Sequence, residues 1–175
     1  SGDGKFRQNS GPAVVHEKVG NHLLQVSQRS FWQGHKRAPE VLTDVVSNFA
    51  EIKNGEHVLD LYGGVGLFTA SSLEAVGSDG SIHLVEGSKD ATSDAKNNFA
   101  GLANVEISTG DVAKIISRIQ SADVVILDPP REGAGKEVVQ QLARIGERVI
   151  IYVACDPAAL ARDTVYLAES GYSLT

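Results

Sequence analysis

The stretch His57-Val-Leu-Asp-Leu-Tyr-Gly-Gly-Val-Gly-Leu-Phe68 decides the fold of this chain. It begins as a short apolar run with one acid, Asp60, and the run ends at Gly63, Gly64 and Gly66. An apolar strand that ends at glycines and continues as a helix is the first βα unit of a nucleotide-binding α/β domain. Glycine suits this turn because its backbone adopts conformations closed to other residues and lets a ligand approach bare N–H groups.

Strands and helices alternate along the rest of the chain. We expect strands at residues 57–62, 81–86, 105–109, 122–128 and 148–154, and helices at residues 39–50, 67–74, 90–100, 112–119, 136–145 and 158–170. Continuous apolar strands separated by helices predict a mostly parallel sheet covered on both faces, in a doubly wound α/β fold. Right-handed crossovers then bring the carboxyl ends of the strands to one rim, where ligands bind.

The N-terminal part is expected to lie outside this sheet. Residues 1–12 are polar and glycine-rich, which indicates a linker or a frayed end. Residues 14–15 and 22–27 are predicted to be short strands on either side of a turn. We therefore expect a linker with a small β extension over residues 1–30 and the ligand-binding domain over residues 31–175.

Two further expectations concern packing and the end of the chain. The helix at residues 39–50 is predicted to bury one apolar face, formed by Val41, Leu42, Val45, Val46 and Phe49. Phe31 and Trp32, just before this helix, are interpreted as core residues rather than as a stacking platform for bases. Residues 172–175 resemble the start of a further strand.

The composition bounds the class of protein. With 175 residues, 42% of them hydrophobic and 22% charged, the chain suffices for one domain with a single core. It contains no apolar run near the roughly 20 residues that cross a bilayer and no signal peptide, so we expect no membrane partner. A single cysteine excludes a disulfide framework and a cysteine-rich metal or iron–sulfur site, which fits a cytoplasmic protein. Because methionine is absent, we interpret the chain as part of something longer.

The net charge of the chain gives only a weak indication about nucleic-acid binding. The formal net charge of −6 argues mildly against binding of nucleic acid by bulk electrostatics alone. Lys36, Arg37 and Arg131 are candidates for contacts with phosphate groups, but solvated surface positions are the commoner role of such residues.

Acidic residues follow three of the predicted strands. Glu86 stands 20 residues after Gly66, where an acid can accept both hydroxyl groups of an adenosine ribose. Asp111 follows the third strand and Asp128, within Asp-Pro-Pro, ends the fourth. Each acid alone is as well explained by a helix N-cap or a solvated loop. Together on one rim they favour an adenosine ligand, and both NAD and S-adenosylmethionine fit this pattern.

The only cysteine follows the fifth strand. Cys155 stands at the carboxyl end of that strand and directly before a helix, whose N-terminal N–H groups lower the pKa of a thiol. A free cysteine is more often a small buried core residue. A cysteine on the rim opposite an adenosine site, however, suggests covalent catalysis beside a cofactor.

These residues resemble a known family, the S-adenosylmethionine-dependent RNA uracil-C5 methyltransferases that act on tRNA or ribosomal RNA. The resemblance extends from about His22 to the end of the chain. The glycine loop is generic to methyltransferases, whereas the Phe-x-Gln, Asp-Pro-Pro-Arg and Cys-Asp-Pro-Ala-x-Leu-Ala-Arg-Asp motifs are specific and occur in the family's order. The matching segments are Ser30-Phe-Trp-Gln33, Leu59-Asp-Leu-Tyr-Gly-Gly-Val-Gly-Leu-Phe-Thr69, Val85-Glu86, Gly110-Asp111, Leu127-Asp-Pro-Pro-Arg-Glu-Gly133 and Val153-Ala-Cys-Asp-Pro-Ala-Ala-Leu-Ala-Arg-Asp163.

The resemblance implies a Rossmann-like methyltransferase domain, a role for each site residue and an RNA substrate. Cys155 would attack C6 of the target uracil, which makes C5 nucleophilic enough to accept a methyl group. S-adenosylmethionine would be the cofactor, with Glu86 at the ribose, Asp111 at the adenine edge, and Tyr62 and Gln33 at the methionine part. The other residues implied in cofactor binding are Gly64, Gly66 and Asp128, of which Asp128 is also a candidate for contact with a flipped base.

The chain also departs from the family. Leu67 occupies a position that is often polar in relatives, which removes or replaces one cofactor contact. An N-terminal RNA-binding domain and an iron–sulfur cysteine set, which some relatives carry, are not in this sequence. The glutamate that removes the C5 proton in the family lies in a segment beyond residue 175, and we assign that role neither to Glu132 nor to Asp156.

Three alternatives stay open at this point. The first is a methyltransferase of another specificity, acting on cytosine or on an amine, because Asp-Pro-Pro resembles the loop of amino-methyltransferases. The second is a non-catalytic scaffold that binds S-adenosylmethionine. The third is an NAD-dependent dehydrogenase, although Thr69 stands where a dinucleotide-binding loop carries its third glycine.

Overall fold

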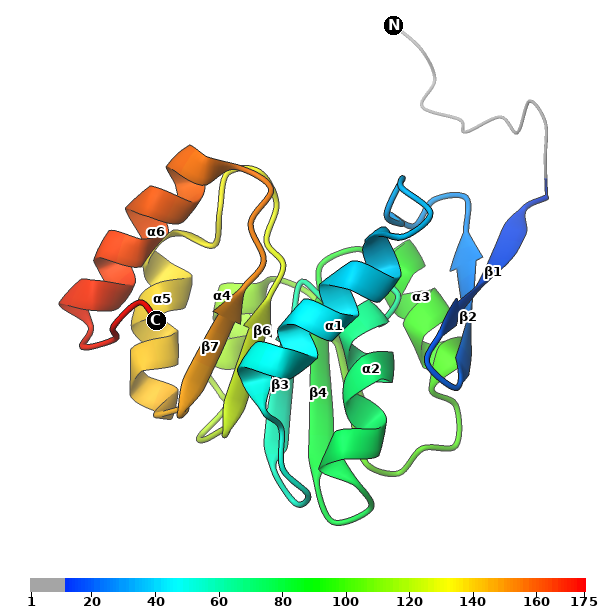
Figure 1. The fold of residues 1–175 in the computed structure, drawn as a ribbon, viewed down its shortest axis with the longest axis horizontal. Helices are drawn as coiled ribbons and strands as arrows, with labels where there is room; N and C mark the ends of the chain where they lie inside the picture. Colours follow the sequence, from blue (N-terminus) through cyan, green and yellow to red (C-terminus); the bar gives the residue numbers. More distant parts are fainter. Residues whose placement is uncertain (1–11) are drawn as a thin grey trace, which may run out of the picture.

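A five-stranded parallel sheet forms the centre of the fold (Figure 1), which a computed structural model describes for residues 12–175. Its strand order is β5-β4-β3-β6-β7, with β3 (His57–Leu61), β4 (Ser81–Glu86), β5 (Val105–Thr109), β6 (Val124–Leu127) and β7 (Val149–Tyr152). The helices are α1 (Ala38–Ala50), α2 (Leu67–Val76), α3 (Lys89–Asn98), α4 (Val112–Ile116), α5 (Gly135–Ile145) and α6 (Pro157–Glu169). The predicted doubly wound α/β fold is confirmed, whereas the predicted linker lies, except for Pro12, outside the described residues.

Alternation along the central strands divides the core into two layers. Val58 and Ile126 pack with α1, α2 and α3 on one face, and Leu59 and Leu127 pack with α4 and α5 on the other. All four side chains are buried, which explains why β3 and β6 are apolar at almost every position. The helices on the two faces are visible in Figure 1, where α6 lies outside α5.

The sheet order reverses between β3 and β6. β3 pairs with β4 on one side and with β6 on the other, and every pair in the sheet is parallel. The loops that leave the carboxyl ends of β3 and β6 therefore turn to opposite faces of the sheet. In open α/β sheets this switch point is where a crevice opens for a ligand.

The N-terminal strands form an antiparallel hairpin, as predicted, and α3 holds it against the domain. β1 (Val14–Val19) pairs with β2 (His22–Ser27) in a separate two-stranded sheet. The side-chain amide of Asn98 accepts a hydrogen bond from Gln25 N at 2.7 Å and donates one to Gln25 O at 3.1 Å. The carboxylate of Asp94 accepts hydrogen bonds from Ser27 N at 2.8 Å and Ser30 Oγ at 2.6 Å. These side chains satisfy backbone groups on the edge of β2.

The predicted buried face of α1 is partly wrong. Val41, Val45 and Phe49 are exposed by 46%, 45% and 63%, while Thr43 and Val46 are buried. The apolar arc of this helix is wider than the surface that covers it, because α1 contacts α2 and the short strand β7 at the edge of the described sheet. Periodicity identifies the apolar arc of a helix but not how much of it the neighbouring elements cover.

The C-terminal expectations also need correction. Residues 172–175 are not a strand, and α4 ends at Ile116 rather than at residue 119. In the described part of the chain, every helix is too short or too polar to cross a bilayer.

We predict that Gly66→Ala destabilises the fold by about 2–4 kcal/mol, because two costs add. Gly66 has φ of +99°, and a Cβ there would lie 2.2 Å from the buried ring of Phe99. Gly101→Ala is the matched control, since Gly101 has φ of +87° but nothing within 4 Å of a Cβ. The control should lose only the backbone cost of about 1–2 kcal/mol. Equal losses in urea unfolding would contradict the packing explanation.

Candidate functional site

The turn between β3 and α2 has the geometry of a ligand-binding loop. Tyr62 adopts a left-handed conformation with φ of +60°, which is uncommon for a residue with a side chain and marks functional sites. Its N–H and that of Gly63 both bind Val85 O, at 2.8 and 3.2 Å, so the turn is fixed to the end of β4. Gly64 and Gly66 also have positive φ, of +57° and +99°. The sequence signal for a glycine turn is therefore matched by a backbone that needs glycine.

An open pocket lies above this turn at the switch point of the sheet. Its empty volume, including space open to solvent, is about 360 Å³. Four of the predicted site residues line it, namely Gln33, Tyr62, Gly64 and Asp128. The remaining lining residues are Phe31, Trp32, Gly63, Val65, Leu67 and Phe68. The pocket thus joins the Phe-x-Gln segment, the glycine turn and the end of β6, which are far apart in the sequence.

A buried carboxylate supports the glycine turn from below. Asp60 is fully buried, and its Oδ2 accepts hydrogen bonds from the backbone N–H of Thr69 at 2.9 Å and from Thr69 Oγ1 at 2.6 Å. Its other oxygen has no hydrogen-bond partner among the described residues. Burial raises the pKa of Asp60 to about 6, against the lowering effect of the two bonds from Thr69. Thr69, which stands where a dinucleotide-binding loop carries its third glycine, therefore connects α2 to β3.

Glu86 and Asp111 lie on the same rim, outside the pocket lining. Glu86 ends β4, and its carboxylate accepts hydrogen bonds from Gly64 N at 3.1 Å and from Ser88 N at 2.6 Å. Asp111 is exposed and caps α4 by accepting a hydrogen bond from Lys114 N at 3.0 Å. Glu86 is therefore held against the glycine turn. Asp111 instead acts as a helix N-cap in this structure, which is the structural role that the sequence left open for it.

The pKa values of two side chains in the pocket, Asp128 and Tyr62, are raised. Burial raises the pKa of Asp128 to about 6. Burial also raises the pKa of Tyr62 to about 12, and the negative charges of Asp111, Asp163 and Glu86 add to this shift. Tyr62 is therefore a neutral hydrogen-bond donor at physiological pH, and Asp128 is an acid that titrates just below it.

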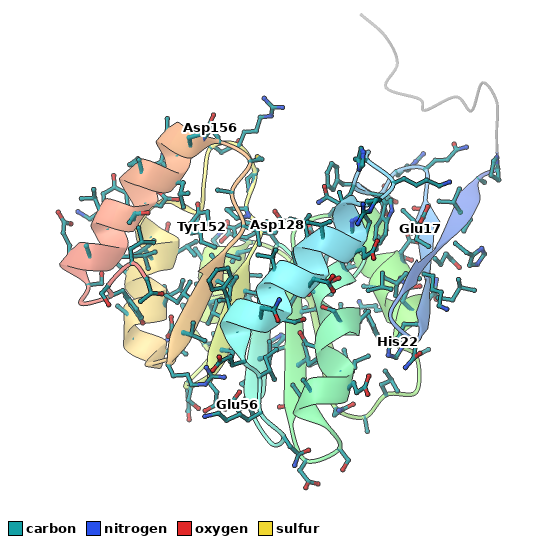
Figure 2. The ribbon with its side chains drawn as sticks, viewed as in Figure 1. Glu17, His22, Glu56, Asp128, Tyr152 and Asp156 are labelled. Atoms are coloured by element: carbon teal, nitrogen blue, oxygen red, sulfur yellow. The ribbon has the colours of Figure 1, made fainter. Side chains whose placement is uncertain are left out.

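Cys155 lies on the rim but not in the pocket lining. It is exposed and stands between β7 and α6, next to Asp156, whose side chain caps α6 by accepting a hydrogen bond from Ala159 N at 2.9 Å. Figure 2 shows Asp128 and Tyr152 at the carboxyl ends of the paired strands β6 and β7, and Asp156 further out at the start of α6. The predicted position of the cysteine before a helix is confirmed, and the alternative of a buried core cysteine is wrong.

Phe31 contradicts its predicted place in the core. Its side chain is 74% exposed at the edge of the pocket, whereas the neighbouring Trp32 packs partly against the core. The chain runs as an irregular segment between β2 and α1, so that consecutive aromatic residues point to different surroundings. An aromatic ring exposed beside a pocket is available for stacking on a planar ligand.

Sequence reasoning missed the roles of three residues near this rim, Tyr152, Asp163 and Asp60. Tyr152 Oη donates a hydrogen bond of 2.7 Å to Oδ2 of Asp163, which is fully buried in α6. Asp163 closes the Cys-Asp-Pro motif in the sequence, but nothing in the pattern says what a buried acid on a helix would bind. The same holds for Asp60, whose only signal was a single acid within an apolar strand.

Solved structures share this fold. The tRNA (uracil-54, C5)-methyltransferase of Pyrococcus abyssi, in complex with S-adenosyl-L-homocysteine, is 26% identical with a TM-score of 0.76, over 90% of this chain and 38% of that chain. A SAM-dependent O-methyltransferase of Thermotoga maritima has a TM-score of 0.63 over 81% of this chain and 52% of that chain, and at 18% identity it shows the fold alone. The sheet, the glycine turn and these likenesses define a Rossmann-like fold of the methyltransferase class.

The chain belongs to the family Conserved hypothetical protein 95, which it matches over residues 38–168. Similar sequences include an uncharacterized RNA methyltransferase of Streptomyces avermitilis, 40% identical over 98% of this chain and 40% of that protein. Another, from Thermotoga maritima, is 34% identical over 98% of this chain and 39% of that protein. The chain thus spans about two-fifths of the length of these curated relatives.

The raised pKa of Asp60 predicts a specific dependence of stability on pH. Its folded pKa of about 6 exceeds the ordinary 3.8, so the folded protein holds a proton that the unfolded chain releases. This contribution to stability is present below pH 4 and is lost as pH rises through about 6. It amounts to roughly 3 kcal/mol for a pKa that folding raises from 3.8 to about 6.

Asp60→Asn removes the titration while its amide oxygen can still accept from Thr69. The free energy of unfolding of wild type relative to Asp60→Asn should therefore decrease between pH 4 and 7, measured in urea at each pH. Asp128 titrates in both proteins, so that only its repulsion of the Asp60 charge is left in the difference. Parallel profiles would contradict the assignment.

Proposed function

We propose that this protein is an S-adenosylmethionine-dependent RNA methyltransferase that methylates C5 of a uridine. The observation that carries the proposal is an exposed cysteine on the rim that also holds the glycine turn, Glu86 and Asp128. Support comes from relatives described as RNA methyltransferases and from the similarity to the uracil-C5 enzyme of Pyrococcus abyssi. Residues 31–175 would form the catalytic domain.

The residues at the pocket fit such a cofactor. Gly64 lines the pocket, and a Cβ added to it would enter open space, so the glycine turn leaves room for a ligand against its backbone. Glu86 would accept the ribose hydroxyl groups, because its carboxylate is already held beside Gly64 at the end of β4. Tyr62 and Gln33 line the pocket and would hold the methionine part. Gly66 would contribute by allowing the turn, and Asp111 by binding the adenine edge beside α4.

Cys155 would make C5 of uracil nucleophilic enough to accept a methyl group. C5 of uracil is a poor nucleophile, and addition of a thiolate to C6 moves electron density to C5. The cofactor supplies a methyl group bonded to a positively charged sulfur. The C5–methyl bond would form as the methyl–sulfur bond breaks, so that the sulfur leaves as a neutral thioether. Loss of the C5 proton to a base would then supply the electron pair that expels the Cys155 thiolate from C6.

A uridine in folded RNA must leave its stack to reach this rim. Phe31 would receive the base, because its ring is exposed beside the pocket and bases in single-stranded RNA stack on aromatic side chains. Asp128 would contact either the flipped base or the cofactor. The exposed Lys36, Arg37 and Arg131 lie in the segments before α1 and after β6 and would meet phosphate groups.

We predict that Glu86→Gln weakens binding of S-adenosylmethionine by about 10–100-fold, since hydrogen bonds to charged groups contribute roughly 1.5–3 kcal/mol. Isothermal titration calorimetry measures the dissociation constant directly. Glu74→Gln, which changes an exposed acid on α2, is the matched control and should bind as wild type does. Equal affinity in Glu86→Gln would remove the ribose assignment, and binding of NADH in place of S-adenosylmethionine would favour a dehydrogenase.

Covalent trapping tests the chemistry. With S-adenosylmethionine and RNA that contains 5-fluorouridine, wild type should form a heat-stable adduct on a denaturing gel, because fluorine does not leave as a proton does. Cys155→Ala should form none. Parallel reactions with tRNA and ribosomal RNA distinguish the two substrate classes. An adduct that persists in Cys155→Ala would contradict covalent catalysis by this residue, and methylation of cytosine or an amine by Cys155→Ala would favour another methyltransferase specificity.

A further inference from the structure

The buried carboxylate of Asp163 accepts hydrogen bonds from five donor atoms. Its Oδ2 accepts from Tyr152 Oη at 2.7 Å, from Ala134 N at 2.8 Å and from Gly135 N at 3.1 Å. Its Oδ1 accepts from Nε and Nη2 of Arg162, at 2.9 and 2.7 Å. A buried carboxylate is costly unless its oxygens are bonded in this way, so the surroundings of Asp163 are built around it.

Donors from both β7 and the start of α5 flank the two loops that carry the proposed reacting groups. Tyr152 ends β7 and precedes Cys155 by three residues, and Asp163 follows Cys155 by eight. The bond between Tyr152 and Asp163 therefore closes the segment that contains the cysteine. Ala134, on the same carboxylate, stands at the end of the loop that begins with Asp128. One carboxylate thus connects the cysteine loop to the Asp128 loop.

The contact between these segments leaves no room for a side chain at Gly133. Gly133 has φ of +82°, and a Cβ there would lie 2.5 Å from Asp163 Oδ2 and 3.2 Å from Tyr152 Oη. The carbonyl of Glu132 accepts a hydrogen bond from Arg162 Nη2 at 2.6 Å, so the backbone of the loop is held at successive residues. The loop after β6 and the middle of α6 therefore meet at one hydrogen-bonded junction. Figure 1 shows this loop passing beside α6 on its way to α5.

We propose that Asp163 and Tyr152 are positioning residues for the transfer, and that they fix the Cys155 loop relative to the Asp128 loop. The proposal rests on the proposed function, in which Cys155 attacks a base that enters beside Asp128. Neither positioning residue lines the pocket, so neither is expected to touch the cofactor. A displacement of about 1 Å in such a reaction costs about 100-fold in rate, which makes the junction a determinant of catalysis.

The charges of the junction suit this role. Burial alone would raise the pKa of Asp163, but the hydrogen bonds from Tyr152, Gly135, Arg162 and Ala134 outweigh it and hold the pKa below its usual range. Burial and the bond to Asp163 both raise the pKa of Tyr152, so its hydroxyl stays a donor. Asp163 is therefore ionised and Tyr152 neutral at physiological pH, and their bond is charge-assisted.

Tyr152→Phe tests the proposal, because it keeps the ring and removes only the hydroxyl. In the full-length protein the rate of adduct formation on 5-fluorouridine RNA should fall by about tenfold or more, as misplacement of the thiol predicts. The dissociation constant for S-adenosylmethionine should change less than threefold, since the glycine turn is untouched. Tyr166→Phe, on the same helix beside Lys136, is the matched control and should react as wild type.

Asp163→Asn should slow the adduct further, and the double variant with Tyr152→Phe should be no slower than Asp163→Asn, because both changes break one network. If Asp163→Asn fails to fold, Tyr152→Phe alone decides. A wild-type rate in Tyr152→Phe would overturn the proposal, and so would a loss that parallels weakened cofactor binding. If wild type itself forms no adduct with tRNA or ribosomal RNA, the proposed function fails and this inference fails with it.

Discussion

The hydrogen bonds between Asp60 and Thr69 are the constraint on which the ligand-binding rim depends. They join the carboxyl half of β3 to the first turn of α2 beneath the glycines, and they do so inside the core, where a carboxylate is costly. The two ends of the glycine turn are thereby connected to each other. The left-handed conformation of Tyr62 persists because its N–H and that of Gly63 are both bonded to Val85 O at the end of β4.

Two other buried carboxylates in the fold likewise accept hydrogen bonds from a segment distant in the sequence. Asp94 on α3 binds the N-terminal hairpin and the segment before Phe31 through Ser27 and Ser30. Asp163 on α6 binds the loop after β6. All three carboxylates are buried. Each replaces apolar packing at a point where irregular backbone meets the regular layers, because a carboxylate can accept several N–H and O–H donors that an apolar side chain would leave unsatisfied. The rim is therefore rigid although its residues lie on loops.

With the proposed function, the cofactor and the reacting cysteine would occupy separate places on this rim. The pocket holds Gln33, Tyr62, Gly64 and Asp128 over the switch point between β3 and β6. Cys155 lies two strands from β3, on the loop after β7. A substrate base entering between these two places would have the methyl donor on one side and the thiol on the other, and the exposed ring of Phe31 borders the entrance.

The sequence alone determined the fold class and which residues lie on the rim. Its apolar runs end at Gly63, Glu86, Asp128 and Cys155. Because parallel strands end on the same side of a sheet, these runs predict a doubly wound sheet with the four residues on one rim. It did not determine which apolar side chains are covered, as the exposed Phe31 and the exposed flank of α1 demonstrate, because local periodicity carries no information about neighbouring elements. Only the tertiary structure decided the roles of Asp60 and Asp163. A buried carboxylate is defined by the donors that surround it, and those donors come from segments distant in the sequence.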